Sequence, residues 1–551
     1  MGILFNLMKK SSIIVFCLSA MMIAHGQYPL DDTLPVQTDP GEKWYGAAVN
    51  TGDLMPFKEG FSLNLYADAK GNQAAPLLIS TGGKYVWSAN PFAFCIVNNQ
   101  LNIFGYKEPI YTEKAGSTLA EAYAAVSKKF FPPSGKMPNT LLFTQPQFNT
   151  WIELIYNQNQ KDILKYAHDI VDNGFTPGVL MIDDNWAPYY GKFEFRKDRF
   201  PDAVAMMAEL HQLGFKVMIW ICPFISPDME VFRDLQTKRL LLMNNKGNKN
   251  LAWKEAADPA IVSWWNGYSG VMDFTNPESI QWFNRQLDYM VNHYGIDGFK
   301  LDAGDPEFYT GNVVSFKEAT PNDHSFLWGE FGIRYPLNEY RAMWKRGGEP
   351  LAERLRDKAH NWPDLKKLIP HITAAGLLGY PFACPDLIGG GEFSSFLDGA
   401  IIDQELIVRS AQCHALMPMM QFSVAPWRVL EKPYLQAVKN AVALRKVFTP
   451  AILSLAHQSA VNGLPIVRNM EYAFPHQGLE GCQDQFMLGD SIMVTPMIER
   501  GHSRLVKFPA GTWKADDGKI IKGPATLTID VPMERLPWFR LVRKSGKAVR
   551  K

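Results

Sequence analysis

The stretch GVLMIDD (178–184) decides the fold together with the segments that follow it. It is an apolar run that ends in two acids. Amphipathic helical stretches and further apolar runs then alternate: AVAMMAELHQLG (203–214), FKVMIWI (215–221), SIQWFNRQLDYMVNHYG (279–295) and IDGFKLDAG (296–304). Because strands that alternate with helices form parallel sheets, this pattern predicts an α/β fold, a (β/α)8 TIM barrel over residues 139–462. Segments 223–275 and 305–340 lack the helical period, and we expect them to be long loops on the catalytic face.

Short alternating segments, separated by Gly, Pro and Asn, lie on both sides of the predicted barrel. They are FSLNLYAD (61–68), KYVWSA (84–89), FAFCIV (92–97), SIMVTP (491–496), RLVKFP (504–509), TLTIDVP (526–532) and WFRLVR (538–543). This pattern is typical of antiparallel sheets. We therefore predict an N-terminal β-sandwich at 27–138 and a C-terminal β-sandwich at 463–551.

Residues 1–26 have the layout of a secretory signal peptide. Lys9 and Lys10 precede the apolar run Ile13–Ala24, and small residues lie before Gln27, where we expect cleavage. A membrane anchor is the alternative, but about 20 apolar residues are needed to span a bilayer and this run is shorter. The sequence thus predicts export to a periplasm or to the cell exterior, with no integral membrane segment after signal cleavage.

The composition argues against several classes of partner. The 551 residues include 56 Lys and Arg and 55 Asp and Glu, a formal charge of +1, so no overall field attracts nucleic acid. The cysteines have no CxxC spacing, so neither a disulfide framework nor a zinc site is indicated. We find no HExxH, P-loop or EF-hand pattern and expect no metal or organic cofactor. Nothing in the sequence indicates an oligomeric state.

Acidic residues lie where the predicted barrel strands end. Asp183 and Asp184 end GVLMIDD, and Asp302 ends DGFKLD. In a barrel of this class the carboxyl ends of the strands form the catalytic face. Lys300 and Asp302 are two positions apart on an extended strand, so both side chains leave the same face, and the ammonium would keep the carboxylate ionised. An ionised carboxylate in a pocket suits a nucleophile, although a purely structural ion pair has the same pattern.

Glycoside cleavage is a reaction that uses such a carboxylate as nucleophile. It also needs a second carboxyl group, which protonates the leaving oxygen. Asp357, in RLRDKAHNW (354–362), and Asp386, in GYPFACPDLIGG (379–390), are the candidates. Asp386 follows an apolar run and precedes a double glycine, which lets the backbone approach a ligand closely, whereas Asp357 lies in a polar loop. The residue types alone leave both open.

From about residue 140 to near its end the chain resembles glycoside hydrolase family 31. The resemblance rests on the order of several motifs: LMIDDNW, KVMIWICPFIS, IDGFKLDAGD, RAMWKRGG with RLRDKAHNW, CPDLIGG, DQELIVRSAQ and DQFMLGDSIMVTP. It implies a (β/α)8 barrel with flanking β-sandwiches. It also implies cleavage of α-linked sugars with retention of configuration.

The resemblance also assigns roles residue by residue. Asp302 matches the nucleophile, with Lys300 beside it. Asp357 matches the general acid/base, because it stands sixteen residues after Arg341 and twenty-nine before Asp386, as in the family pattern. Arg341 and Asp386 match substrate-binding residues. Asp183 and Trp220 match residues of the −1 subsite, the pocket that holds the sugar to be cleaved.

The departures from the family pattern bear on the sugar. Glucosidase members carry a His where this chain has Ser423, and the motifs are similar to the branch that contains α-galactosidases. Asp184, beside Asp183, is predicted to bind an axial hydroxyl. We also expect the stretch 42–57, with Trp44, to reach the barrel mouth. The predicted function is therefore a secreted retaining α-galactosidase that acts on an oligosaccharide or glycoconjugate.

Three alternatives remain open at this stage. The first is an α-glucosidase or α-xylosidase on the same fold. The second is a transglycosylase that passes the sugar to a hydroxyl group with the same residues. The third is a catalytically inactive carbohydrate-binding protein, although pure binding would not need both Asp302 and Asp357.

Overall fold

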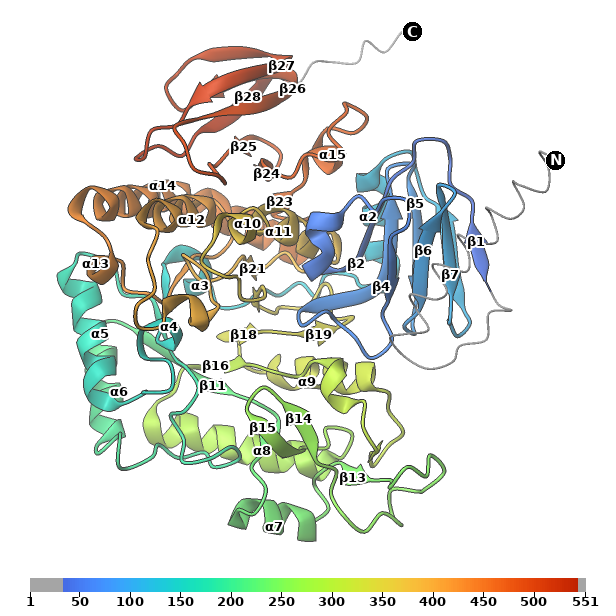
Figure 1. Cartoon of the computed structure of the whole chain (residues 1–551), viewed down its shortest axis with the longest axis vertical. Helices are drawn as coiled ribbons and strands as arrows, with labels where there is room; N and C mark the ends of the chain where they lie inside the picture. Colours follow the sequence, from blue (N-terminus) through green and yellow to red (C-terminus); the bar gives the residue numbers. More distant parts are fainter. Residues whose placement is uncertain (1–32, 544–551) are drawn as a thin grey trace.

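The computed structural model describes residues 33–543 and places a parallel barrel at the centre of the molecule (Figure 1). Its eight strands are, in spatial order, β21 (Ala383–Cys384), β20 (Glu353–Arg354), β18 (Asn338–Tyr340), β16 (Gly298–Leu301), β11 (Lys216–Ile221), β10 (Val179–Ile182), β9 (Gln147–Asn149) and β22 (Gln421–Phe422). A parallel bridge between Leu387 and Gln421 joins the two ends of this order. The predicted α/β barrel is confirmed.

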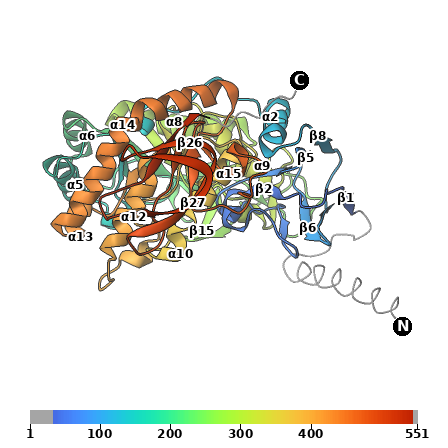
Figure 2. The same cartoon turned by 90° about the horizontal axis from the view of Figure 1, so that it is seen from above.

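Helices cover the barrel on its outside (Figures 1 and 2). They include α5 (Gln160–Asp172), α6 (Ala203–Gln212), α8 (Pro277–Tyr289), α11 (Leu368–Leu377), α12 (Gln404–Ala415) and α14 (Lys432–Asn462). Their starts are set locally, because the Asn159, Asp202 and Asn276 side chains accept backbone N–H groups of the first turns of α5, α6 and α8. α14 ends at Gly463, which has a φ of 73°.

The expectation that 305–340 is one long loop is wrong. The segment contains helix α9 (Pro321–Gly332) and barrel strand β18. α9 begins with a capping box, in which the side chains of Thr320 and Asp323 each accept the other residue's backbone N–H. Its buried half contains the polar residues Asn322, His324 and Ser325, and the apolar Phe326 and Leu327 are only half-buried, so the apolar stripe that reveals an amphipathic helix is missing.

Two antiparallel sheets precede the barrel, beside it in Figure 1. One contains β1 (Leu34–Val36), β7 (Gln100–Phe104), β6 (Ala93–Val97) and β3 (Ser62–Asn64), and the other contains β2 (Trp44–Ala48), β4 (Gln73–Ser80), β5 (Lys84–Ser88) and β8 (Ile110–Lys114). The second sheet continues into the barrel, because β19 (Met343–Trp344), from the loop after β18, pairs with β4. The N-terminal domain is therefore joined to a catalytic-face loop by backbone hydrogen bonds.

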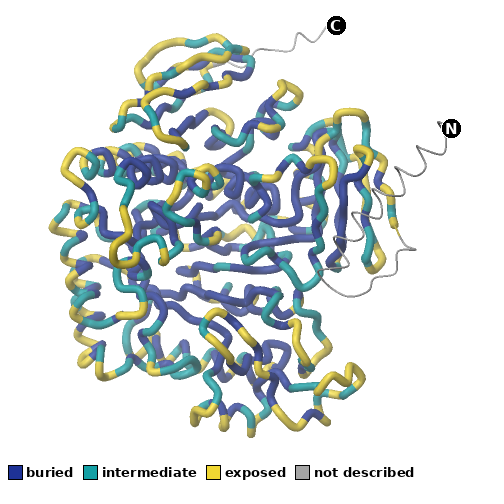
Figure 3. Tube along the Cα trace, in the orientation of Figure 1, coloured by how far each residue is buried: buried dark blue, intermediate teal, exposed yellow. Residues whose placement is uncertain are grey.

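The C-terminal domain is an antiparallel sheet that lies over α12 and α14 (Figure 1). Its strands are β23 (Val467–Arg468), β24 (Phe486–Leu488), β25 (Ile492–Val494), β28 (Trp538–Arg543), β26 (Ser503–Ala515) and β27 (Ile520–Asp530). They form one continuous six-stranded sheet. The domain has its own hydrophobic core, which includes Met487, Met493, Val506, Trp513 and Phe539. Figure 3 shows buried barrel strands and a largely exposed β27 at the edge.

The predicted signal peptide at 1–26 lies outside the described residues. Within residues 33–543, none of the helices combines the length and the apolar character that crossing a bilayer requires.

A buried arginine ties α14 to the base of the barrel. The guanidinium of Arg445 donates to the carbonyls of Met417 and Pro418 at 2.7 Å and to that of Phe143 at 2.8 Å. Burial lowers its pKa to about 10, which still leaves it charged at neutral pH. Three buried carbonyls from two separate chain segments thus depend on one side chain.

Replacing this arginine should destabilise the protein. Arg445→Met leaves the buried carbonyls without donors, which should cost about 3 kcal/mol or more. We expect a clearly lower thermal unfolding temperature, measured by circular dichroism. Lys446→Met, at the exposed neighbouring position, is the control and should unfold close to the parent. Equal unfolding temperatures for the parent and Arg445→Met would contradict the role of Arg445.

Candidate active site

Three neighbouring barrel strands bring the predicted acids to one rim. Asp183 directly follows β10, Asp302 directly follows β16, and Trp220 lies on β11 between these two strands, in register with Lys300. Because parallel strands end at the same edge, side chains that leave the same face converge there. All four side chains are buried.

Asp302 is held by two hydrogen bonds. The indole Nε1 of Trp220 donates to Oδ2 at 2.7 Å, and the backbone N–H of Ala303 donates to Oδ1 at 2.9 Å. Burial by itself would raise the pKa of Asp302, but the positive charges of Lys300, Arg341 and Arg354 lower it below its usual value. The carboxylate is therefore ionised at neutral pH, as a nucleophile requires.

Lys300 has a different direct partner from the one that its spacing suggested. Its Nζ donates to Asp183 Oδ2 at 2.7 Å, and both side chains are at most 4% exposed. The other oxygen of Asp183 accepts the backbone N–H of Asp184 at 2.9 Å. Lys300 thus acts on Asp302 through its charge, while it fixes the Asp183 carboxylate.

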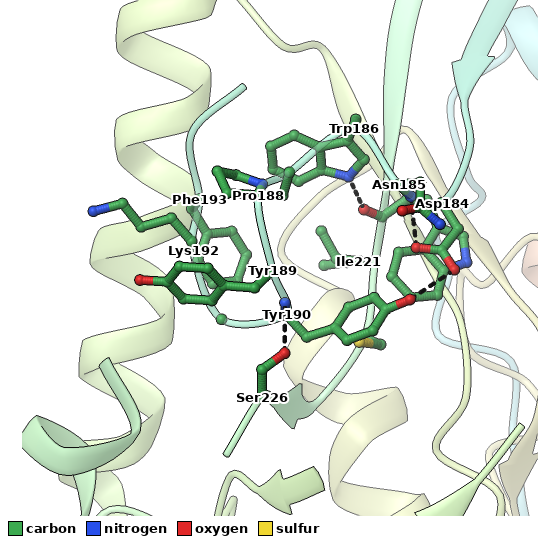
Figure 4. A pocket seen from close by; sticks show the side chains of 14 residues that line it. Asp184, Asn185, Trp186, Pro188, Tyr189, Tyr190, Lys192, Phe193, Ile221 and Ser226 are labelled. Atoms are coloured by element: carbon green, nitrogen blue, oxygen red, sulfur yellow. Dashed lines mark hydrogen bonds between the residues drawn. The ribbon is translucent and has the colours of Figure 1, made fainter. Parts of the chain in front are cut away.

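Asp184 is the centre of a polar cluster on the same rim (Figure 4). Its Oδ2 accepts hydrogen bonds from the Tyr190 hydroxyl at 3.0 Å and from Asn266 Nδ2 at 2.8 Å, and the Asn185 backbone N–H donates to Oδ1 at 2.6 Å. Burial, followed by the charge of Asp183, raises the pKa of Asp184 to about 7. The Asp184 carboxyl group is therefore protonated more readily than that of an ordinary aspartate.

A cavity of about 240 Å³ borders this cluster. Aromatic residues on its walls include Trp186, Tyr190 and Phe193, from the loop after β10, and Trp220 on β11. Figure 4 shows the Tyr190 hydroxyl directed at Asp184 along one wall. Within residues 33–543 no group of three His, Cys, Asp or Glu side chains is arranged to hold a metal ion.

Asp357 and Asp386 meet at a second cluster on the barrel mouth. Arg354 of β20 donates to Asp357 Oδ1, and the same guanidinium nitrogen lies 3.5 Å from Asp386 Oδ1. Asp386 Oδ2 also accepts the Lys358 backbone N–H at 2.9 Å. A Cβ at Gly391 would overlap both carboxyl groups, so only glycine fits there. The structure therefore brings both candidates for the second carboxyl together.

Arg341 connects the two clusters. Its Nε lies 3.8 Å from Asp302 Oδ1 and 3.5 Å from Asp305 Oδ2, and its Nη1 lies 4.0 Å from Asp357 Oδ2. The guanidinium also covers the ring of Trp265, with its Cζ 4.8 Å from the ring centroid. Asp302 and Asp357 are thus both within reach of one side chain.

The predicted contribution of Trp44 is wrong. Trp44 is buried at the end of β4 that pairs through Ser80, whereas the barrel loop pairs with the opposite end, at Gln73. At about 3.3 Å per residue the two ends are roughly 20 Å apart. The indole N–H of Trp44 donates to Thr38 inside the N-terminal domain.

A different part of the N-terminal domain reaches the site. The side-chain amides of Asn72 and Gln73 donate to the backbone carbonyl of Arg341 at 2.8 Å and 2.9 Å. The loop before β4 therefore helps to place the arginine that lies between the two carboxylates.

Several residues of the site were not found from the sequence. Arg354 lies on a strand of only two residues, too short to show an alternation. Its Nε is 3.5 Å from Glu339, which in turn accepts a hydrogen bond from Gln421 at 2.6 Å inside the barrel. Tyr190 and Asn266 lie in loops, where only the fold reveals their proximity to Asp184. Only Glu339 had a usable signal: in NEYR (338–341) it is two positions before Arg341, so both side chains leave the same face of the strand.

Ser423, at the position where glucosidase members carry a His, is fully buried. Its hydroxyl donates to the Asn149 carbonyl at 3.0 Å and accepts the Ile152 backbone N–H at 2.7 Å. Both bonds are to the backbone, so this side chain supports the chain after β9.

Comparisons with known proteins agree with this architecture. Residues 141–455 match the glycosyl hydrolases family 31 TIM-barrel domain, and residues 463–544 match the glycosyl hydrolase family 31 C-terminal domain. Myogenesis-regulating glycosidase of Mus musculus is 30% identical over 435 residues, which are 77% of this chain and 60% of that protein. Alpha-glucosidase 2 of Bacillus thermoamyloliquefaciens is 23% identical over 424 residues, 71% of this chain and 51% of that protein. The chain thus spans 51 to 60% of the length of these relatives.

Solved structures show the same fold. The family 31 dextranase of Flavobacterium johnsoniae superposes with a TM-score of 0.81 at 18% identity, covering 93% of this chain and 67% of that one. An α-xylosidase from a soil metagenome superposes with a TM-score of 0.77 at 20% identity, covering 93% and 79%. Because the match to the TIM-barrel domain of the family spans more than half of the chain, the chain belongs to glycoside hydrolase family 31.

Proposed function

We propose that this protein is a retaining exo-α-glycosidase that removes terminal α-linked galactose from an oligosaccharide or glycoconjugate. The observation that carries the proposal is the placement of Asp302 and Asp357 within 4.0 Å of the same Arg341 guanidinium. One of these carboxyl groups is held ionised by surrounding cations, and the other lies on the more open side, with its side chain 24% exposed. Two carboxyl groups at one sugar site are what glycoside cleavage requires.

In the first step of the proposed reaction, Asp302 attacks the anomeric carbon of the bound sugar. A bond forms between a carboxylate oxygen of Asp302 and that carbon while the glycosidic C–O bond breaks. The departing oxygen takes a proton from Asp357. Trp220 and the Ala303 N–H hold the attacking carboxylate in place, so little orientation has to be achieved during the step.

In the second step a water molecule displaces Asp302 from the sugar. Asp357, now a carboxylate, takes a proton from the water molecule as its oxygen bonds to the anomeric carbon, and the bond to Asp302 breaks. Two inversions give net retention. The carboxyl groups of retaining enzymes are about 5–5.5 Å apart, whereas those of inverting enzymes are about 6.5–9.5 Å apart.

Two features of the pocket support galactose as the sugar. Asp184, Tyr190 and Asn266 form a cluster beside Asp183 whose oxygen atoms offer acceptors to an additional hydroxyl, while the donors of Tyr190 and Asn266 are used within the cluster. The hydroxyl of Ser423 is occupied by backbone partners, so this position contributes no sugar contact of the kind that an imidazole would make. We assign Asp184 to the axial hydroxyl that distinguishes galactose from glucose.

We also propose that the protein is exported, because Lys9, Lys10 and the apolar run Ile13–Ala24 have the composition of a signal peptide. Its site would then act on carbohydrates outside the cytoplasm.

Loss of either carboxylate should abolish turnover. We expect Asp302→Ala and Asp357→Ala to lower kcat at least about 1000-fold on an α-galactoside with an alkyl leaving group. The exposed Asp198→Ala is the control and should retain parental activity. A 2-fluoro or 5-fluoro galactosyl fluoride should label the Asp302 peptide in mass spectrometry. Near-full activity in either variant would refute its role, and a clear preference for nitrophenyl α-glucoside or α-xyloside over the α-galactoside would refute the sugar.

Two adjacent tyrosines test the assignment of Asp184. Tyr190→Phe removes a hydrogen bond to its carboxylate and should lower kcat/KM for nitrophenyl α-galactoside about 10- to 100-fold. Tyr189→Phe removes a hydroxyl that contacts the exposed Glu230 at 3.4 Å and should leave kcat/KM unchanged. The assignment fails if the two variants behave alike.

The raised pKa of Asp184 predicts a pH effect on stability. Between its usual pKa of 3.8 and about 7, the folded protein keeps a proton that the unfolded chain has released. The contribution of this group to stability is therefore full below about pH 4 and falls as the pH rises toward 7. Asp184→Asn removes this dependence. Relative to the parent, its thermal unfolding temperature should rise between pH 4 and 7, and a constant difference would contradict the prediction.

A further inference from the structure

We propose that Arg354 is a positioning residue for the general acid/base and holds the Asp357 carboxyl group in its working orientation. Asp386 and Glu339 keep this arginine paired with a carboxylate while Asp357 changes its charge. The inference rests on the proposed function of Asp357. It concerns a residue that contacts the acid/base and has no assigned role in the proposed reaction.

The Asp357 carboxylate receives fewer hydrogen bonds than that of Asp302. Asp302 receives hydrogen bonds from an indole and from a backbone N–H. Within residues 33–543, only Arg354 donates a hydrogen bond to the Asp357 carboxylate, and Arg341 adds a longer ion pair at 4.0 Å. Asp357 also lies outside regular secondary structure. Its orientation therefore depends mainly on one side chain.

Arg354 is well placed for this task because it is itself fixed. It lies on β20, its side chain is 3% exposed, and its Nε is 3.5 Å from Glu339 Oε1 in the barrel interior. Glu339 is in turn held by Gln421 at 2.6 Å. The guanidinium is thus anchored in the barrel and presents one nitrogen to the mouth.

The same nitrogen, Nη1, is directed at two carboxyl groups. It contacts Asp357 Oδ1 and lies 3.5 Å from Asp386 Oδ1. During catalysis Asp357 must be neutral before the glycosidic bond breaks and anionic before water attacks. A buried cation with a single partner would be left uncompensated in the neutral stage, which is costly. Asp386 and Glu339 keep Arg354 paired in both stages.

The state of Asp386 fits this arrangement. Burial raises its pKa to about 7, and the charge of Asp357 acts in the same direction, against the cations Lys358 and Arg354. Asp386 is therefore poised to respond to a change of charge on its neighbour. Gly391 lies against both carboxyl groups without a Cβ, so the two can share the arginine.

Two substrates whose leaving groups differ in their need for a proton can distinguish a positioning role of Arg354 from a general contribution to the folded structure. Breaking the bond to an alkyl leaving group needs the proton of Asp357, whereas fluoride leaves α-galactosyl fluoride without one. The kcat/KM value reports on this first step. Arg354→Met should lower kcat/KM about 100-fold or more for the alkyl galactoside. For the fluoride we expect a fall of less than about 10-fold, the same pattern as for Asp357→Ala.

Further variants complete the test. Asp302→Ala should lower kcat/KM for both substrates, and Arg445→Met, which removes a buried arginine far from the mouth, should affect the two substrates equally. Arg354→Lys keeps the charge without the planar fork and should recover part of the loss on the alkyl galactoside. If Arg354→Met does not fold, Arg354→Lys alone decides. Its ratio of fluoride to alkyl kcat/KM should exceed that of the parent at least about threefold, with a shifted basic limb in the pH profile.

Equal losses of kcat/KM on both substrates, or no loss on either, would overturn the role of Arg354. A parent enzyme that hydrolyses neither galactosyl, glucosyl nor xylosyl fluoride would instead overturn the proposed function. If another of these fluorides is the better substrate, the same pair of leaving groups is used on that sugar.

Discussion

Charge pairing in the barrel interior is the constraint on which the site depends. Lys300, Arg341 and Arg354 are largely buried, and such charges are tolerated only when opposite charges and hydrogen bonds compensate them. Each has its partner: Asp183 for Lys300, Asp302 and Asp305 for Arg341, and Glu339, Asp357 and Asp386 for Arg354. The positive charges of Lys300, Arg341 and Arg354 lower the pKa of Asp302 and so keep that carboxylate ionised in a buried position.

The site depends on the N-terminal domain as well as on the barrel. Arg341, which lies between the two proposed catalytic carboxylates, has its backbone carbonyl held by Asn72 and Gln73 of the N-terminal domain. Strand β4 of that domain also pairs with β19, only two residues after Arg341. The hydrogen bonds that dock the N-terminal domain onto the barrel therefore also hold the backbone at and near Arg341.

Much of the barrel and part of the site could be predicted from the sequence. Apolar runs that end in acids marked β10 and β16, and the family resemblance proposed Asp357 rather than Asp386 as the general acid/base. The errors have physical causes. The buried half of helix α9 carries polar residues such as Asn322 and His324, so the sequence shows no amphipathic period there. The family resemblance implies an N-terminal loop over the barrel mouth and thereby favoured Trp44, but Trp44 packs within the N-terminal sheets.

By itself the sequence determined the barrel, the strand ends that carry Asp183 and Asp302, and the helix starts, because these follow from periodicity and from side chains a few residues apart. Only the tertiary structure decided which charges meet. Lys300 bonds Asp183, 117 positions away, and not its neighbour Asp302, and Arg354 stands among three carboxylates from different strands and loops. Such pairings depend on how the strands are packed around the barrel, and no local pattern along the chain encodes that geometry.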